Sequence, residues 1–149
     1  MNGVTMAKSK QDTPEASVKK RRKTIKYVPK EVILTAAQAR CALRKWQNIL
    51  NLRDWQLNVK ICTGGFDEES THLAEVHSEA QNRRAVIHLR QPGTFQSEYK
   101  RDMELDLVHE LVHVVFWWLS VEDNEAFAIL NEQSIESTAQ AFITIDRCE

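Results

Sequence analysis

Three residues in one short segment have the types and the spacing of a metal site. Residues 108–113 spell VHELVH, so His109 and His113 stand four positions apart and Glu110 follows the first histidine. On a helix, residues four apart lie on one face, one turn apart, so both imidazoles can bind a single zinc ion. Glu110 lies about 100° round the helix from His109, where its carboxylate can reach a water molecule on the ion. The pattern therefore predicts Zn2+ held by two histidines, with Glu110 as the general base of a hydrolysis.

The neighbours of this motif predict that its helix is buried. The helix is apolar nearly all round, through Leu105, Leu107, Val108, Leu111, Val112, Val114 and Val115. Two histidines and a glutamate on a buried helix are costly without a partner, and a metal ion would supply one. The alternative interpretation is a pair of ordinary core histidines beside a chance glutamate.

A catalytic zinc site with one open position needs a third protein ligand. The extended three-histidine motif would need glycine at position 116 and histidine at 119, where this chain has Phe116 and Leu119. That version is excluded.

The next predicted helix offers two glutamates in place of a third histidine. Glu132 falls inside the apolar arc of its helical wheel, and Glu136 lies near the edge of the arc. The residues that define this arc are Ala128, Ile135, Ala139, Phe142 and Ile143. A carboxylate on a buried face calls for a cation, so Glu132 is the predicted third ligand. Glu136 is expected to accept a hydrogen bond from a ligand histidine, or to exchange roles with Glu132.

The motif followed by a glutamate on a second helix resembles the gluzincin type of zinc peptidase. Asn131, Glu132 and Glu136 match a segment that supplies the third ligand and an acid that orients a ligand histidine, although many members have aspartate at the last position. The chain is also similar to small SprT-like and ImmA/IrrE-like domains and to metallopeptidases of phages and prophages. The ImmA/IrrE resemblance would instead make Glu136 the ligand, so both glutamates remain candidates.

The pattern of the remaining chain predicts a compact α+β domain. A helix is expected over 34–52 with Thr35 as its cap, and strict alternation predicts a strand over 55–61. Strands over 72–80 and 83–89 should meet at a turn around 81–82, and helices should cover 97–119 and 122–145. The resemblance implies a zincin-like fold with a three-stranded, mainly antiparallel sheet. By the same analogy, strand 84–89 would be the edge that pairs with an extended substrate.

The charge of the chain is divided unevenly. Residues 1–30 hold nine Lys and Arg and two acidic residues, whereas the other 119 hold eleven and nineteen. The predicted organisation is a disordered basic tail over 1–30 and a metallopeptidase domain over 31–149. The tail is expected to be a solvated leader, or an arm that makes weak contact with nucleic-acid phosphates.

The composition also indicates the cellular compartment in which the protein is expected. Three widely spaced cysteines and no apolar leader predict free thiols in a reducing, cytoplasmic setting, and the longest apolar run, 114–119, is too short to span a bilayer. The expected function is zinc-dependent hydrolysis of peptide bonds in a protein or peptide substrate. The alternatives are a non-catalytic regulatory or docking module of phage or prophage origin, and, as the SprT-like resemblance implies, a DNA-associated protease.

Overall fold

A computed structural model describes residues 26–63, 72–93, 100–117 and 125–148. These residues form three α-helices, three β-strands and one short 3-10 turn at Ala80–Asn82. In chain order the elements are α1 (Ala36–Ile49), β1 (Gln56–Cys62), β2 (Ala74–Glu79), β3 (Arg84–Arg90), α2 (Met103–Val115) and α3 (Glu125–Asp146). The predicted α+β class is confirmed.

The sheet is mixed, which corrects the mainly antiparallel sheet expected from the sequence. Its strand order is β1-β3-β2, with β1 parallel to β3 and β2 antiparallel to β3. The hairpin makes β2 and β3 antiparallel, and β3 takes the central place because it buries Ala85, Ile87 and Leu89. No residue of β2 is fully buried, so β2 suits the edge.

The central place of β3 overturns one expectation. Strand 84–89 already pairs on both sides, so it cannot be the edge that receives an extended substrate. Within the described part of the chain, β2 is the sheet edge nearest the helix that carries the motif. Any strand addition beside the motif would therefore have to use β2.

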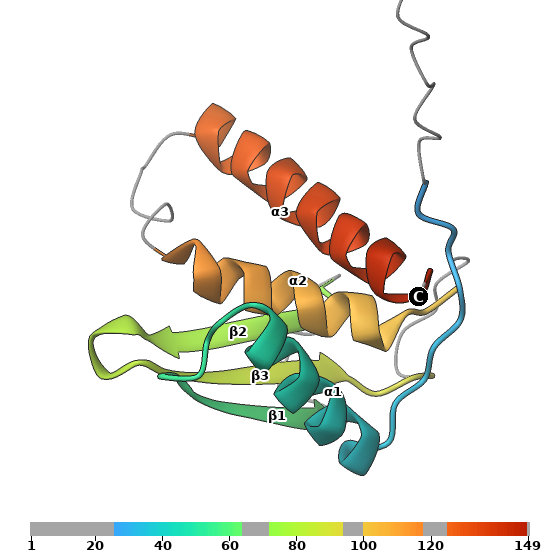
Figure 1. Ribbon diagram of the computed structural model, residues 1–149, viewed down its shortest axis with the longest axis horizontal. Coiled ribbons are helices and arrows are strands. Elements are labelled where there is room, and N and C mark those ends of the chain that lie inside the picture. Colours follow the sequence, from blue (N-terminus) through green and yellow to red (C-terminus); the bar gives the residue numbers. More distant parts are fainter. Residues whose placement is uncertain (1–25, 64–71, 94–99, 118–124, 149) are drawn as a thin grey trace, which may run out of the picture.

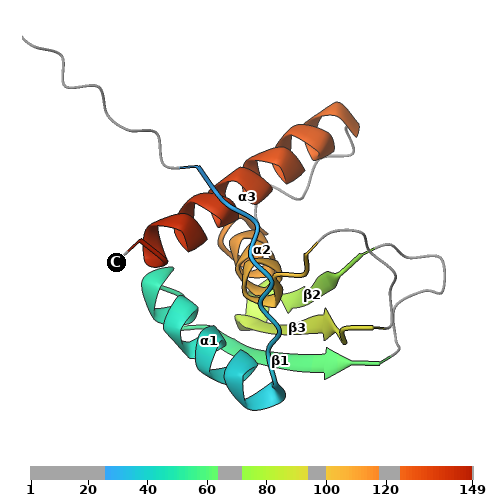
Figure 2. The ribbon, with the colours of Figure 1, turned by 90° about the vertical axis from the view of Figure 1, so that its right-hand side faces the viewer.

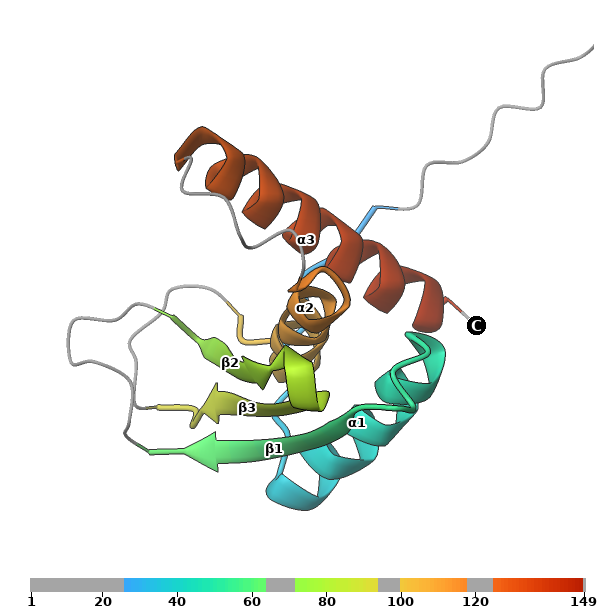
Figure 3. The same cartoon turned by 90° about the vertical axis from the view of Figure 1, so that its left-hand side faces the viewer.

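The helices are stacked on one face of the sheet. Figure 1 shows α2 between the sheet and α3, and Figure 3 shows α3 crossing α2 on the side away from the strands. The α1 helix packs against β1 and α2, and it buries Leu43 and Trp46. Leu107, Leu111 and Ile135 join the same core, each with no more than 1% of its surface exposed. The motif helix is therefore the middle layer of the fold.

The α1 helix begins as the sequence predicts. Thr35 is its N-cap: its hydroxyl accepts from the Gln38 backbone N–H, and the Gln38 side chain accepts from the Thr35 N–H. Such a reciprocal pair satisfies two of the N–H groups that the first turn leaves without helical partners.

The α2 helix begins later than the expected residue 97, at Met103, although residues 94–99 lie outside the described part. Val32 explains this start, because its N–H donates to the Arg101 carbonyl at 2.8 Å and its carbonyl accepts from the Met103 N–H at 2.9 Å. The two bonds hold 101–103 in an extended path until Asp102 caps the helix through the Leu105 N–H. Figure 2 shows the N-terminal segment passing the end of α2 on its way to α1.

Asp102 joins three segments that are distant in sequence. Its buried carboxylate accepts two bonds from the Arg147 guanidinium, at 2.7 and 2.9 Å, and one from the Tyr27 hydroxyl at 3.0 Å. Burial and then the charge of Asp102 raise the pKa of Tyr27 to about 12, so its hydroxyl remains a donor at neutral pH. Asp102 thus ties the N-terminal segment and the end of α3 to the start of α2.

None of the helices in the described ranges combines the length and the apolar character needed to cross a membrane.

Replacing Asp102 with alanine should lower the free energy of unfolding by about 3 kcal/mol, because the change removes the α2 cap and leaves Arg147 without its main partner. Urea denaturation followed by circular dichroism measures this loss. Asp54→Ala is the matched control, since its ion pair with Arg83 is exposed and should contribute under about 1 kcal/mol. Equal losses in the two variants would contradict the role given to Asp102.

Candidate metal centre

The described structure places the VHELVH motif on α2, with both histidines directed toward α3. Apolar packing orients this helix: Leu107, Val108, Leu111 and Val112 are almost fully buried. The His109 and His113 side chains keep only 16% and 29% of their surface exposed. The helix spacing and the buried face together bring the two rings within 4.9 Å of each other, centroid to centroid.

Three ligand-type atoms from α2 and α3 converge at one point. The Nε2 atoms of His109 and His113 are 3.2 Å apart. Glu132 reaches both rings: one carboxylate oxygen lies 2.9 Å from His109 Nε2, and the other lies 3.4 Å from His113 Nε2. Among the residues described, these three form one of two groups whose donor atoms all lie within 4.8 Å of one another.

The geometry of the cluster fits a tetrahedral metal ion. With metal–ligand bonds near 2.0–2.1 Å, neighbouring ligand atoms in a tetrahedron are about 3.3 Å apart. The two Nε2 atoms are 3.2 Å apart, close to that value. One oxygen of the Glu132 carboxylate lies 2.9 Å from His109 Nε2, and the other oxygen lies 3.4 Å from His113 Nε2. Two imidazoles with one carboxylate form a donor set suited to zinc and to similar transition metals. The residues present therefore fit the predicted Zn2+.

Glu136 lies one turn from Glu132 and contacts the opposite nitrogen of the same histidine. Its carboxylate oxygen is 3.0 Å from His109 Nδ1, and its other oxygen accepts a hydrogen bond from Gln140 at 2.6 Å. A proton on Nδ1 that donates to Glu136 leaves His109 Nε2 as a lone-pair donor directed at the convergence point. Glu136 thus lies where it can orient a ligand, and Glu132 lies where it can be one.

The acidic groups create a field that favours a cation. Burial opposes a charge on His109, but the hydrogen bond to Glu136 and the charges of Glu110 and Glu132 raise its pKa overall. Burial, and then the charge of His109, lower the pKa of His113. The bond from His109 lowers the pKa of Glu136. Without a metal, a proton on His109 would offset part of the negative charge of the surrounding carboxylates, which a bound cation would otherwise neutralise.

Glu110 is the most deeply buried carboxylate of the centre, with 7% of its surface exposed. Burial, only partly offset by the charge of His109, raises its pKa to about 7. A carboxyl group with such a pKa can both accept and release a proton near neutral pH. A cation bound beside it would favour the carboxylate form.

The exposure of the two glutamates differs from the helical-wheel expectation. The Glu132 side chain is 56% exposed and that of Glu136 is 44% exposed, although Glu132 was placed deeper in the apolar arc. The α3 helix buries Ile135, Ala139 and Ile143, and its N-terminal turns, which carry Glu132, are largely exposed. Glu132 therefore reaches the histidines from the open side of the centre.

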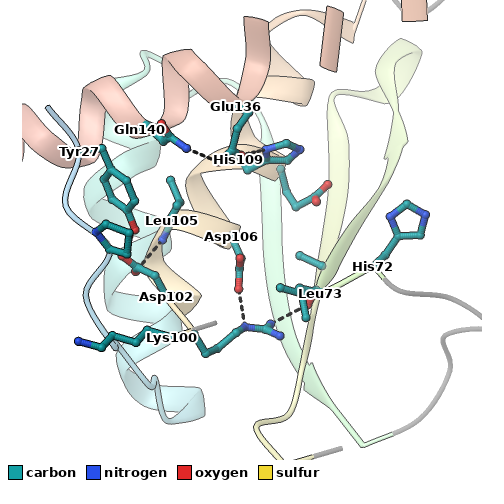
Figure 4. Close-up of a pocket in the computed structure, with 14 residues that line it drawn as sticks. Tyr27, His72, Leu73, Lys100, Asp102, Leu105, Asp106, His109, Glu136 and Gln140 are labelled. Carbon is teal, nitrogen blue, oxygen red and sulfur yellow. Dashed lines mark hydrogen bonds and ion pairs between the residues drawn. The ribbon is translucent and has the colours of Figure 1, made fainter. Parts of the chain in front are cut away.

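A cavity of about 650 Å³ opens beside His109 and Glu110 (Figure 4). Its walls come from the N-terminal segment, the start of β2, α2 and α3. The side chains drawn there include Tyr27, His72, Leu73, Lys100, Asp106 and Gln140. None of these residues was predicted from the sequence to line this cavity. No local spacing links these residues, so only the folded chain brings them together.

One wall of the cavity is an ion pair that the sequence did not reveal. Arg101 Nε lies 2.6 Å from a carboxylate oxygen of Asp106, and the Arg101 guanidinium also donates to the Leu73 carbonyl at 2.7 Å. The pair thereby attaches the beginning of β2 to α2. Burial raises the pKa of Asp106 to about 6, even though Arg101 opposes the rise.

Zinc affinity should separate the roles of the two glutamates. We expect Glu136→Ala to weaken binding by about 10–100-fold, the usual effect of losing the partner of a ligand histidine. Glu132→Ala should weaken it further, because it removes a donor atom from the ion itself. Competition with a chromophoric chelator measures both, and Glu125→Ala, an exposed position on α3, is the control. The reverse order would assign Glu136 as the ligand.

Asp106 predicts a pH dependence of stability. Because its folded pKa of about 6 exceeds the ordinary 3.8, the folded chain holds this proton more tightly than the unfolded chain does. Its contribution to the free energy of unfolding therefore falls as pH rises from about 4 to 6, by roughly 1–3 kcal/mol. Urea titrations of wild type and Asp106→Asn across this range measure the free energy of unfolding of each. As pH rises, the value for wild type should fall relative to the value for the variant. A wild type that gains on the variant as pH rises would contradict this.

Comparison of the chain with protein-family models, with curated proteins and with solved structures finds no match.

Proposed function

We propose that the protein is a zinc-dependent metallopeptidase with a zincin-like arrangement of its catalytic helices. The observation that carries the proposal is the convergence of His109 Nε2, His113 Nε2 and the Glu132 carboxylate within 2.9–3.4 Å, beside the buried Glu110. A hydrolase needs such a centre to keep one position open and a base within reach. The resemblance of the motif to gluzincins supports the same assignment.

The chain's own groups would divide the work of hydrolysis. When bound, zinc would lower the pKa of a water molecule and polarise the carbonyl of the scissile bond. Glu110 would take the proton from the attacking water and deliver it to the leaving amine, a task that suits a buried carboxylate with a pKa near neutrality. Glu136 would hold His109 in the orientation that keeps Nε2 available.

The topology suggests how a substrate would approach. The Arg90 N–H donates to the Leu73 carbonyl, so the alternation of the antiparallel ladder turns the backbone groups of Ala74, Val76 and Ser78 away from β3. An extended peptide could pair with these groups while one of its side chains enters the cavity beside His109. This path would favour flexible or unfolded segments of protein as substrates.

The regulatory and DNA-associated alternatives depend on the basic tail. Residues 1–25 lie outside the described part of the chain, and these alternatives stay predictions from sequence. Cytoplasmic location and contact with nucleic acid are likewise predictions from the sequence.

Glu110→Gln should abolish proteolysis and leave zinc binding intact, because glutamine keeps the shape of the side chain but cannot accept the proton. General-base catalysis contributes about 10²–10⁴-fold, so the rate should fall by at least two orders of magnitude. The assay is cleavage of a labelled unstructured protein by the zinc-loaded enzyme, with bound zinc measured on the same samples. Glu31→Gln, a matched change at an exposed site, should behave as wild type.

Two results would count against the peptidase. One is a Glu110→Gln variant that cleaves as fast as wild type. The other is a wild type that carries zinc at the centre yet cleaves no unstructured protein, which would favour the docking role.

A further inference from the structure

We propose a second transition-metal site, formed by Glu75, His77 and His88 on the face of the β2–β3 hairpin that points away from the helices. It shares no residue with the centre between α2 and α3. The sequence gives no hint of it, because its histidines are eleven positions apart and lack the spacing of a metal-ligand motif.

The sheet register brings the three residues together. Glu75 on β2 is directly opposite His88 on β3, and His77 is two positions along β2 on the same face. The other face of the hairpin is the buried one, because Ala85, Ile87 and Leu89 pack into the core. The cluster is therefore held by the backbone hydrogen bonds between β2 and β3, and not by flexible side chains alone.

The donor atoms already lie at metal-site spacing. One Glu75 carboxylate oxygen is 3.1 Å from His77 Nε2 and 3.1 Å from His88 Nδ1. These separations are close to the edge of about 3.3 Å expected for a tetrahedral ion. The ligand atoms of all three residues lie within 4.8 Å of one another, and the two rings are inclined at 58° with centroids 5.2 Å apart.

The chemistry of the set indicates which ion would bind. Two imidazole nitrogens and one carboxylate favour Zn2+, Cu2+ or Ni2+ over Mg2+ and Ca2+, which prefer sets made of oxygen alone. In the absence of a metal, both rings can donate a hydrogen bond to the same oxygen. A metal ion would replace the two ring protons and draw all three donors to one centre.

The position of the site suggests a structural role. The His77 side chain is 65% exposed, so the cluster is accessible from solvent and leaves room for water as a further ligand. An ion there would cross-link the edge strand β2 to the central strand β3. Ala74, the first residue of β2, and Leu73 just before it line the cavity beside His109, so the cross-link would also stabilise one wall of that cavity.

Zinc stoichiometry tests the proposal directly. Metal-free protein is dialysed against Zn2+ at low micromolar concentration, and bound zinc is measured per chain. Wild type should bind one equivalent more than His77→Gln and Glu75→Gln, and excess Mg2+ should not displace it. His72→Gln and Glu79→Gln are the matched controls outside the cluster, and both should bind as much as wild type.

A double variant, His109→Ala with His113→Ala, separates this site from the catalytic centre. It should still bind one equivalent of zinc, and adding His77→Gln should remove that equivalent. The hairpin site is refuted if His77→Gln and Glu75→Gln bind as much zinc as wild type. If the centre between α2 and α3 did not bind zinc, the result would be different: wild type would then bind the same amount of zinc as the double variant.

Discussion

The burial of α2 between the sheet and α3 constrains the rest of the molecule. A helix in the middle layer loses water on nearly every side, and this one carries His109, Glu110 and His113 into that environment. Ionisable groups in such a place must find partners or change their protonation. The raised pKa of Glu110 and the opposite shifts of the two histidines are the electrostatic signs of this constraint. Glu132 and Glu136 of α3 provide acidic partners for the histidines from the opposite side.

The placement of α3 along α2 decides which carboxylate does what. Glu132 and Glu136 are one turn apart, so a slide of α3 by about 5.4 Å would bring Glu136 to the place that Glu132 now holds beside the histidines. Two features prevent that slide: the burial of Ile135, Ala139 and Ile143, and the double hydrogen bond from Arg147 to Asp102. The ion pair at the far end of α3 therefore helps to set the geometry of the candidate metal centre.

The same type of donor set occurs twice in the described structure, built on different periodicities. On α2 the histidines are four apart, which is the spacing of one helical turn. On the hairpin, two residues at strand spacing meet a third from the neighbouring strand. The two histidines of the helical set are visible in six consecutive letters of the sequence. The cross-strand set depends on strand pairing that no local pattern encodes, so the sequence alone does not predict it.

Local periodicity in the sequence was enough to predict several elements of this protein. The VHELVH spacing indicated two converging imidazoles, the alternation over 55–61 indicated β1, and Thr35 marked the start of α1. These features depend on neighbours within a few residues. The tertiary structure alone decided that β3 is central and β2 is the edge, that α2 starts at Met103, and that Arg101 and Asp106 wall a cavity. It also decided which nitrogen each α3 glutamate contacts, because strand order and helix placement follow from the burial of whole elements against one another.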